Sequence, residues 1–218
     1  MKNFQVAIDG PAGSGKSTIS KLIAKELKFQ YLDTGAMYRA ITYQALALKI
    51  NLEDDTAYQF IEKLKLEYKN DKMYLNGKDV SLEIRKPNVT NNVSTVAKNK
   101  SVRIKMKDFQ QKIASNGQVI LDGRDIGSNV LPNANLKVFL TATIECRANR
   151  RFLENQAAGI KSSLKELLEE IALRDHTDAT RKYAPLKKAD DAVTIDTTEL
   201  SINEVCAEII KLIHERMF

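Results

Sequence analysis

Short apolar runs alternate along this chain with longer segments in which apolar residues return every three or four positions. The runs are typical of buried strands, and the wider spacing is typical of helices that bury one face. The predicted strands cover residues 4–8, 31–32, 119–121, 137–140 and 193–195. The predicted helices cover residues 19–27, 37–48, 54–64, 88–114 with a break near 99, 145–158, 164–173 and a final segment from 201 onward. Because strands and helices alternate, we expect an α/β protein whose parallel sheet is flanked by helices in three layers.

The pattern changes in one place, over about residues 64–86. Residues 66–68 and 73–75 read as two short strands separated by a polar turn, which predicts a β-hairpin. Asn76-Gly77 marks a further turn after the second strand. We therefore expect a small antiparallel insertion in a chain that otherwise alternates.

The composition fits one α/β domain. The 218 residues are 43% hydrophobic, which is enough to bury a core. The net charge of +6 suits an anionic partner, although it does not separate nucleic acids from nucleotides. The two cysteines, Cys146 and Cys206, form no CxxC pair and no metal-ligand spacing. The first strand begins within a few residues of the N-terminus and no apolar run approaches membrane length, so we expect a cytoplasmic protein with no membrane partner.

A glycine-rich motif follows the first predicted strand. Residues 10–17, GPAGSGKS, match G-x-x-x-x-G-K-[ST] and lead directly into a predicted helix, which is the setting of a phosphate-binding loop. Glycines let the backbone N–H groups turn inward, and the helix N-terminus adds partial positive charge. Lys16 is expected to reach the β- and γ-phosphates, and the Ser17 hydroxyl to bind Mg²⁺. The predicted ATP-binding residues are Gly10, Pro11, Ala12, Gly13, Ser14, Gly15, Lys16, Ser17 and Thr18.

Arginines stand at further positions where phosphates could bind. Arg39 follows the second predicted strand and Arg124 follows the third. Ligands of open α/β sheets bind beyond the carboxyl ends of the strands, so both are expected near Lys16. Arg150 and Arg151 lie together on one predicted helix, whereas Arg174 and Arg181 bracket a polar stretch. Several guanidinium groups at one site indicate several phosphates, since each can pair with two phosphate oxygens.

The remaining polar residues favour phosphoryl transfer to another phosphate. His176 and His214 are the only histidines, and no cysteine–histidine or serine–histidine arrangement is indicated. A nucleoside monophosphate has a second pKa near ~6, so it is already mostly ionised at neutral pH and needs no general base. An alcohol acceptor such as shikimate would need a carboxylate, and Asp33, Asp122 and Asp125 could each serve. A kinase for another monophosphate or for such an alcohol is therefore the alternative.

A second alternative belongs to another functional class. A nucleic-acid-stimulated ATPase would also use a phosphate loop and a basic surface. The chain lacks a basic tract with interleaved aromatic residues, and its arginines follow strand ends. It also lacks the N-K-x-D or T-K-x-D tetrapeptide that reads guanine in nucleotide switches. We therefore expect no nucleic-acid partner.

Four blocks together resemble bacterial cytidylate kinases: residues 8–17, 32–39, 122–125 and 174–181. The resemblance covers nearly the whole chain, and the D-[ST]-G-A-x-Y-R and D-G-R-D blocks are its most specific part. It implies a P-loop NTPase-type fold and in-line transfer of the γ-phosphoryl group of ATP to CMP or dCMP, with Mg²⁺ bound by Ser17. It implies one chain, expected to be a monomer, with a core at about 1–63, 115–158 and 186–218, a monophosphate-binding region with the insertion at about 64–114, and a lid at about 159–185.

The same resemblance assigns roles to individual residues. The catalytic set is Lys16, Arg39, Arg124, Arg150, Arg151 and Arg181, with Arg150 or Arg151 acting on the ATP side. The CMP-binding set is Thr34, Arg39, Ser94, Arg103, Arg124, Asp125, Arg174, Asp178 and Arg181. Arg39, Arg124 and Arg181 would clamp the phosphate with Thr34 nearby, where the family commonly has serine. Arg174 and Asp178 would contact the sugar.

The base contacts implied by the resemblance are Ser94, Arg103 and Asp125. Cytosine presents an N4 amino donor, which a carboxylate or hydroxyl can accept, and N3 and O2 acceptors, which Arg103 can serve. Uracil would turn a carbonyl toward Asp125, a mismatch that costs about 1–3 kcal/mol. Closure of the lid would expel water that competes for the phosphoryl group.

Overall fold

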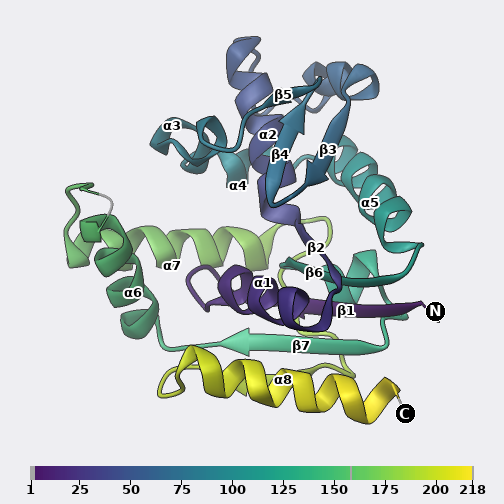
Figure 1. The fold of residues 1–218 in the computed structure, drawn as a ribbon. Helices are drawn as coiled ribbons and strands as arrows, with labels where there is room; N and C mark the ends of the chain where they lie inside the picture. Colours follow the sequence, from purple (N-terminus) through teal and green to yellow (C-terminus); the bar gives the residue numbers. More distant parts are fainter. Residues whose placement is uncertain (1–2, 158, 218) are drawn as a thin grey trace.

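A parallel sheet lies at the centre of the computed structural model, which describes residues 3–157 and 159–217 (Figure 1). Within those residues five strands pair in the order β2-β6-β1-β7-β8, and every neighbouring pair is parallel. The strands are β1 (Phe4–Asp9), β2 (Gln30–Asp33), β6 (Gln118–Gly123), β7 (Leu136–Thr141) and β8 (Val193–Asp196). The expected α/β class and parallel sheet are confirmed. The central position of β1 places the glycine-rich motif between the carboxyl ends of β6 and β7.

Helices cover both faces of the sheet because the strand residues alternate in direction. Val6 and Ile8 share an apolar cluster with residues of α1 (Lys16–Leu27) and α8 (Ile202–Met217). Ala7, between them, belongs to a second cluster with residues of α2 (Thr34–Ala47) and α5 (Lys100–Ala114). Ser201 and Glu204 exchange side-chain and backbone hydrogen bonds at the start of α8 and so form a capping box. The three layers are therefore set by the period-two pattern of the strands.

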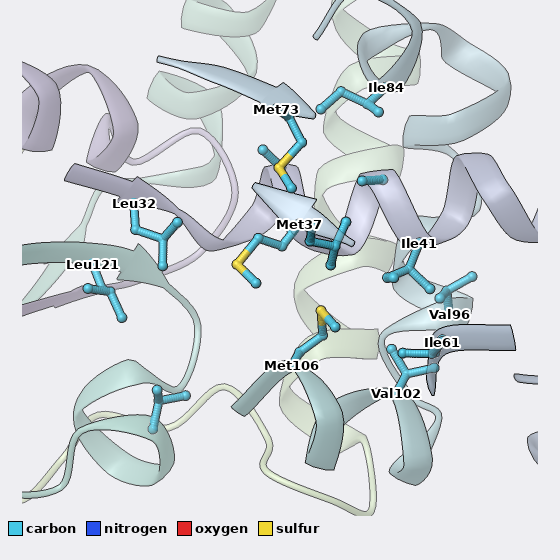
Figure 2. Packing of buried hydrophobic residues seen from close by; sticks show 14 of the residues in the cluster. Leu32, Met37, Ile41, Ile61, Met73, Ile84, Val96, Val102, Met106 and Leu121 are labelled. Atoms are coloured by element: carbon cyan, nitrogen blue, oxygen red, sulfur yellow. The ribbon is translucent and has the colours of Figure 1, made fainter. Parts of the chain in front are cut away.

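The inserted region packs on α2. β3 (Leu66–Lys69), β4 (Lys72–Leu75) and β5 (Lys78–Asp79) form an antiparallel sheet, which confirms the predicted hairpin and adds a short strand. Met73 of β4 lies close to Met37 of α2 in the shared apolar cluster (Figure 2). Short helices flank this sheet in the sequence: η1 (Asp55–Lys63) precedes it, and η2 (Glu83–Arg85), α3 (Pro87–Thr90) and α4 (Val93–Val96) follow it. The region thus continues the core on one side of the sheet.

Two helices project beyond the carboxyl end of β7. α6 (Ile144–Ala157) and α7 (Leu164–Thr180) pack on each other through Ala148, Leu167 and Ile171 (Figure 1). α7 then runs back between the inserted region and α1 (Figure 1). No helix in the described part of the chain is both long and apolar enough to cross a bilayer.

Several predicted boundaries need correction. Helix α7 continues to Thr180 instead of ending near residue 173. Its last turns bury the polar Asp178, so no apolar residue marks them as helical in the sequence. The predicted helix at 54–64 is a 3₁₀-helix, and the pattern over 88–114 is split into three helices, the last capped by Asn99. Helix α2 begins at Thr34 rather than residue 37 because Asp33 caps it. The predicted end of α6 at residue 158, and residues 1, 2 and 218 of the predicted core, lie outside the described residues.

Candidate active site

The glycine-rich loop joins β1 to α1 and requires glycine at specific positions. A Cβ on Gly10 would lie 2.0 Å from the Leu140 carbonyl oxygen of β7, so a side chain is excluded there. Gly15 is the N-cap of α1 and has φ 86°, in the left-handed region that glycine adopts without strain. The loop therefore presents backbone N–H groups at a helix N-terminus, as the sequence predicts.

Lys16 is buried inside this loop. Its Nζ donates hydrogen bonds to the Pro11 carbonyl at 2.6 Å and to Ser14 Oγ at 3.2 Å. Burial lowers the pKa of Lys16 well below its usual value, and the neighbouring charges of Arg124 and Arg174 lower it further. Arg124 and Arg174 are thus close enough to Lys16 to lower its pKa.

Asp122, the penultimate residue of β6, ties the loop to the neighbouring strands. Its Oδ2 accepts a hydrogen bond of 2.6 Å from Ser17, and its Oδ1 accepts one of 2.9 Å from Tyr31. Burial, reinforced by the charge of Asp33, raises the pKa of Asp122 to about 6. Among the described residues no three His, Cys, Asp or Glu side chains gather as a metal site. The Ser17–Asp122 pair nevertheless offers the hard oxygen atoms that Mg²⁺ prefers, with phosphates and water left to complete its shell.

The end of β2 and the start of α2 hold the first arginine of the acceptor side. Arg39 Nη2 donates to Asp33 Oδ2 at 3.0 Å, while Asp33 Oδ1 caps α2 by accepting from the Ala36 N–H. Burial opposes ionisation of Asp33, yet Arg39, the cap and the nearby Arg85 keep its pKa below the usual value. Thr34 Oγ1 donates to the Asp122 carbonyl at 2.7 Å. The hydroxyl of Thr34 is therefore fixed at the junction of β2 and β6.

Helix α7 brings Arg174, Asp178 and, directly after its last residue, Arg181 to the carboxyl end of β6. Arg124 Nε donates to Asp178 Oδ2 at 3.0 Å, and Arg181 Nη1 lies 3.7 Å from Asp178 Oδ1. Burial opposes ionisation of Asp178, but these three arginines hold its pKa below the usual value. The pKa of Arg174 falls to about 10 because it is buried and lies near Arg124. The structure thus brings together three of the predicted arginines around one carboxylate.

Asp125 lies at the centre of a second polar cluster. Its Oδ2 accepts from Arg103 Nη2 and, at 2.9 Å, from Asn129 Nδ2, and its Oδ1 accepts from Arg181 Nη2 at 3.1 Å. The Arg103 guanidinium lies 5.5 Å from the ring centre of Tyr38. This buried arginine connects Asp125 to α4, because its Nη1 donates to the carbonyl of the residue that follows that helix.

Ser94 is the predicted base contact with the least direct support. It lies half-buried in α4, on the short helix whose end Arg103 contacts. No hydrogen bond of its hydroxyl is found among the described residues. The structure therefore brings the helix of Ser94 to the Arg103–Asp125 cluster, and the role of its hydroxyl stays a prediction.

Arg150 and Arg151, predicted to act on the ATP side, contact segments other than the phosphate loop in this structure, and their role stays a prediction. Arg150 donates to the side chain and the carbonyl of Thr197, after β8. Arg151 is half exposed and pairs with Glu154 at 3.4 Å. Both residues lie farther along α6 than its first turn, which contacts the phosphate loop. Their guanidinium groups therefore contact other segments.

Arg147, which the sequence patterns did not single out, lies in the first turn of α6. Its Nε donates to the Ala142 carbonyl and its Nη1 to the Ala12 carbonyl, each at 3.0 Å, and it forms an ion pair with Asp175. The available signal was its position: Arg147 is the first arginine after β7, which neighbours β1.

Asp9 is another buried polar residue that sequence patterns did not single out. Its carboxylate accepts hydrogen bonds of 2.8 and 2.7 Å from the N–H groups of Ile126 and Gly127. Burial raises the pKa of Asp9 to about 7, although these two hydrogen bonds oppose the rise. The last residue of β1 thus fixes the turn that carries Arg124 and Asp125.

The chain is similar to known proteins over almost its whole length. The model of the cytidylate kinase family matches residues 6–215. The chain is 51% identical over 221 residues to a cytidylate kinase of Ligilactobacillus salivarius (strain UCC118), covering 99% of each chain. It is 49% identical over 217 residues to a cytidylate kinase of Bacillus cereus (strain ATCC 10987 / NRS 248), covering 97% of this chain and 96% of the relative.

A solved structure supports the fold. The shikimate kinase of Bacteroides thetaiotaomicron superposes with a TM-score of 0.51 at 13% sequence identity, covering 97% of this chain and 98% of that one. At this identity the likeness concerns the arrangement of helices and strands.

Proposed function

Because the chain belongs to the cytidylate kinase family, we propose that it transfers the γ-phosphoryl group of ATP to CMP or dCMP through the residues described above. One observation carries the assignment of these residues. The buried Nε atoms of Arg39, Arg103 and Arg174 have no hydrogen-bond partner within residues 3–157 and 159–217. Unpaired guanidinium donors in a buried site are costly unless a ligand accepts from them, and a nucleotide offers phosphate, sugar and base acceptors.

On the donor side, the loop from Gly10 to Thr18 would hold the triphosphate through its backbone N–H groups. Lys16 now donates to Pro11 and Ser14, and it would exchange these partners for β- and γ-phosphate oxygens. Its charge would then stabilise negative charge that develops during transfer. The proposal therefore requires a movement of the Lys16 side chain but not of the loop.

Ser17 and Asp122 fit a magnesium ion bound with ATP. Ser17 would provide a hydroxyl ligand, and Asp122, its 2.6 Å partner, would act as acceptor for the ligand or for a bound water. Mg²⁺ bound there supplies neutralisation of charge on the phosphate oxygens. The rest of the catalytic work falls to the residues of the chain, which orient the two nucleotides.

On the acceptor side, Arg39, Arg124 and Arg181 would hold the phosphate of CMP, with Thr34 beside them. The attacking oxygen is already ionised at neutral pH, so alignment and charge neutralisation are sufficient. Arg174 and Asp178, which sit on one face of α7, would contact the sugar. Movement of the segment at about 159–185 would then exclude water from the transferring group.

The Asp125 carboxylate suits recognition of cytosine. An ionised carboxylate can accept about four hydrogen bonds, and three donors already occupy Asp125. Two of these donors share Oδ2, which leaves an acceptor position on Oδ1 for the N4 amino group. Arg103, with its unpaired Nε, and Ser94 would serve the remaining polar atoms of the base.

The alcohol-kinase alternative finds less support. The three aspartates that could act as a base are each engaged: Asp33 with Arg39, Asp122 with Ser17, and Asp125 with Arg103 and Arg181. The family match also favours a nucleoside monophosphate over shikimate or a nucleic-acid-stimulated ATPase. We expect the enzyme to work as a monomer in the cytoplasm, without a nucleic-acid or membrane partner.

The deciding experiment compares acceptors. Steady-state assays with ATP and Mg²⁺ would test CMP, dCMP, UMP, AMP and shikimate, and we expect the highest kcat/KM for CMP or dCMP. Calorimetry would test binding of CMP in the presence of Mg²⁺ and a nonhydrolysable ATP analogue. Failure to bind CMP under these conditions contradicts the proposal.

A further inference from the structure

Arg147 joins three segments of the chain at the phosphate loop. Its guanidinium donates to the Ala142 carbonyl after β7 and to the Ala12 carbonyl in the loop, each at 3.0 Å. The same side chain forms an ion pair with Asp175 of α7. Arg147 is only 7% exposed, so these contacts replace water rather than compete with it.

Asp175 completes a clamp on Ala12. While one carboxylate oxygen pairs with Arg147, the other accepts a hydrogen bond of 3.3 Å from the Ala12 N–H. The pair therefore holds both backbone polar groups of Ala12. The next residue, Gly13, is packed so closely that a Cβ there would lie 3.0 Å from Arg147 Cβ. The conformation of the phosphate loop is thus fixed from the side of α6 and α7.

The same helix reaches into the acceptor half-site. Asp178, three residues after Asp175, accepts from Arg124, and Arg174 precedes Asp175 directly. Residues three or four apart lie on adjoining turns of one helix face, and a helix transmits displacement as a rigid element. A shift of α7 that moves Asp175 relative to Ala12 must also move Arg174 and Asp178 relative to Arg124.

We propose that Arg147 and Asp175 are positioning residues that couple the ATP and CMP half-sites through α7. This inference rests on the proposed function. Binding of the triphosphate restricts the loop around Ala12 to one conformation. The Arg147–Asp175 pair, which bonds Ala12, then holds α7 in one position relative to the loop. The sugar and phosphate contacts of CMP are then already in place, so each nucleotide raises the affinity for the other by the same factor.

The test measures that factor by calorimetry. The dissociation constant of CMP is determined with and without saturating AMP-PNP and Mg²⁺, for the wild type, Asp175→Asn and the control Glu170→Gln. Glu170 is an exposed carboxylate on the same helix. We expect CMP to bind at least about fivefold more tightly with AMP-PNP in the wild type and the control, and less than about twofold more tightly in Asp175→Asn.

A second variant distinguishes loss of coupling from loss of the folded state. Asp175→Asn leaves the buried Arg147 unpaired, which destabilises a protein strongly, whereas Arg147→Met combined with Asp175→Asn removes both charges. This double variant should also lose the coupling while its urea unfolding stays cooperative. An unchanged coupling factor in the folded variants, or no coupling in the wild type, overturns the inference. A wild type that binds neither nucleotide contradicts the proposed function instead.

Discussion

The hydroxyl of Ser17 donates a 2.6 Å hydrogen bond to Oδ2 of Asp122, 105 positions later in the chain. Parallel pairing of β1 with β6 creates this contact, because it sets Asp122 opposite Ile8, just before the phosphate loop. The Ser17 hydroxyl belongs to the glycine-rich motif, whereas the Asp122 carboxylate comes from a strand far from that motif in the sequence.

The first prediction concerns magnesium and pH. We expect Asp122→Asn to raise the free Mg²⁺ needed for half-maximal activity by about 10–100-fold, as for other residues that orient a metal ligand. Because the pKa of Asp122 is about 6, the wild-type requirement should rise as the pH falls through 6, while that of the variant should change less. Activity titrated with Mg²⁺ from pH 5.5 to 8 measures this. Asp190→Asn, at an exposed position, serves as the control, and equal requirements in all three proteins would contradict the assignment.

The second prediction concerns Lys16. Lys16→Ala should leave the fold intact and lower kcat by at least about 10²-fold, because it removes a charge aimed at the transferring group. The control is Lys25→Ala, at an exposed position of the same helix. Coupled kinetic assays with circular dichroism of both variants provide the measurement. Near-normal turnover of Lys16→Ala would refute the role.

The third prediction concerns the choice of base. Asp125→Asn should reduce the ratio of kcat/KM for CMP over UMP by about tenfold to a hundredfold, because the amide can donate to the uracil carbonyl. Taking the ratio cancels any general loss caused by weaker contacts to Arg103 and Arg181. Asp108→Asn, on the exposed side of α5, should keep the wild-type ratio. If Asp125→Asn also keeps it, Asp125 does not read the base.

The fourth prediction concerns Gly10. Gly10→Ala should destabilise the fold by about 3 kcal/mol or more, since the new Cβ would lie 2.0 Å from a backbone oxygen that cannot move freely. Gly77→Ala also has a positive φ, but no atom lies within 4 Å of its Cβ position, so its cost should stay near ~1 kcal/mol. Urea unfolding of the two variants compares them. Similar stabilities would show that strand β7 can yield at Leu140.

The fifth prediction concerns Asp9. Its pKa is raised to about 7 in the folded protein, so the native state holds a proton that the unfolded chain releases above pH ~4. The contribution of this group to stability is therefore present below pH ~4 and lost as the pH rises through 7. The free energy of unfolding of the wild type, relative to Asp9→Asn, should fall by up to about 1.4 kcal/mol per pH unit in this range. Urea unfolding at pH 4.5, 5.5, 6.5 and 7.5 measures it, and parallel curves would argue against the raised pKa.

Local patterns predicted the parts of the molecule that depend on local interactions. The phosphate loop follows from glycines between a strand and a helix, and the hairpin at 66–75 from two short apolar runs around a polar turn. The position of Arg124 near Lys16 follows from the rule that parallel strands end at one edge. Each of these inferences needs only neighbours in the sequence or the direction of the sheet.

The features that the sequence did not predict depend on packing between distant segments. The rotation of α6 decides that Arg147, rather than Arg150 or Arg151, touches the loop, and packing on α7 sets that rotation. The last turns of α7 bury Asp178 against Arg124 of another segment and Arg181 at the helix end, so this polar stretch of sequence resembles an exposed loop. Buried ion pairs between distant segments leave no apolar periodicity, and hydrophobic patterns therefore miss them.

The strand order has a mechanical consequence. In the part of the chain that the structure describes, β2 is an edge strand held by β6 alone over Gln30–Asp33, whereas β1 is bonded on both sides. The phosphate loop thus follows a strand that is bonded on both sides, whereas α2 and the inserted sheet follow a strand that one four-residue ladder holds. Bending of that ladder would tilt α2 and the inserted sheet together, and would so move Arg39 of α2 relative to the phosphate loop without bending β1.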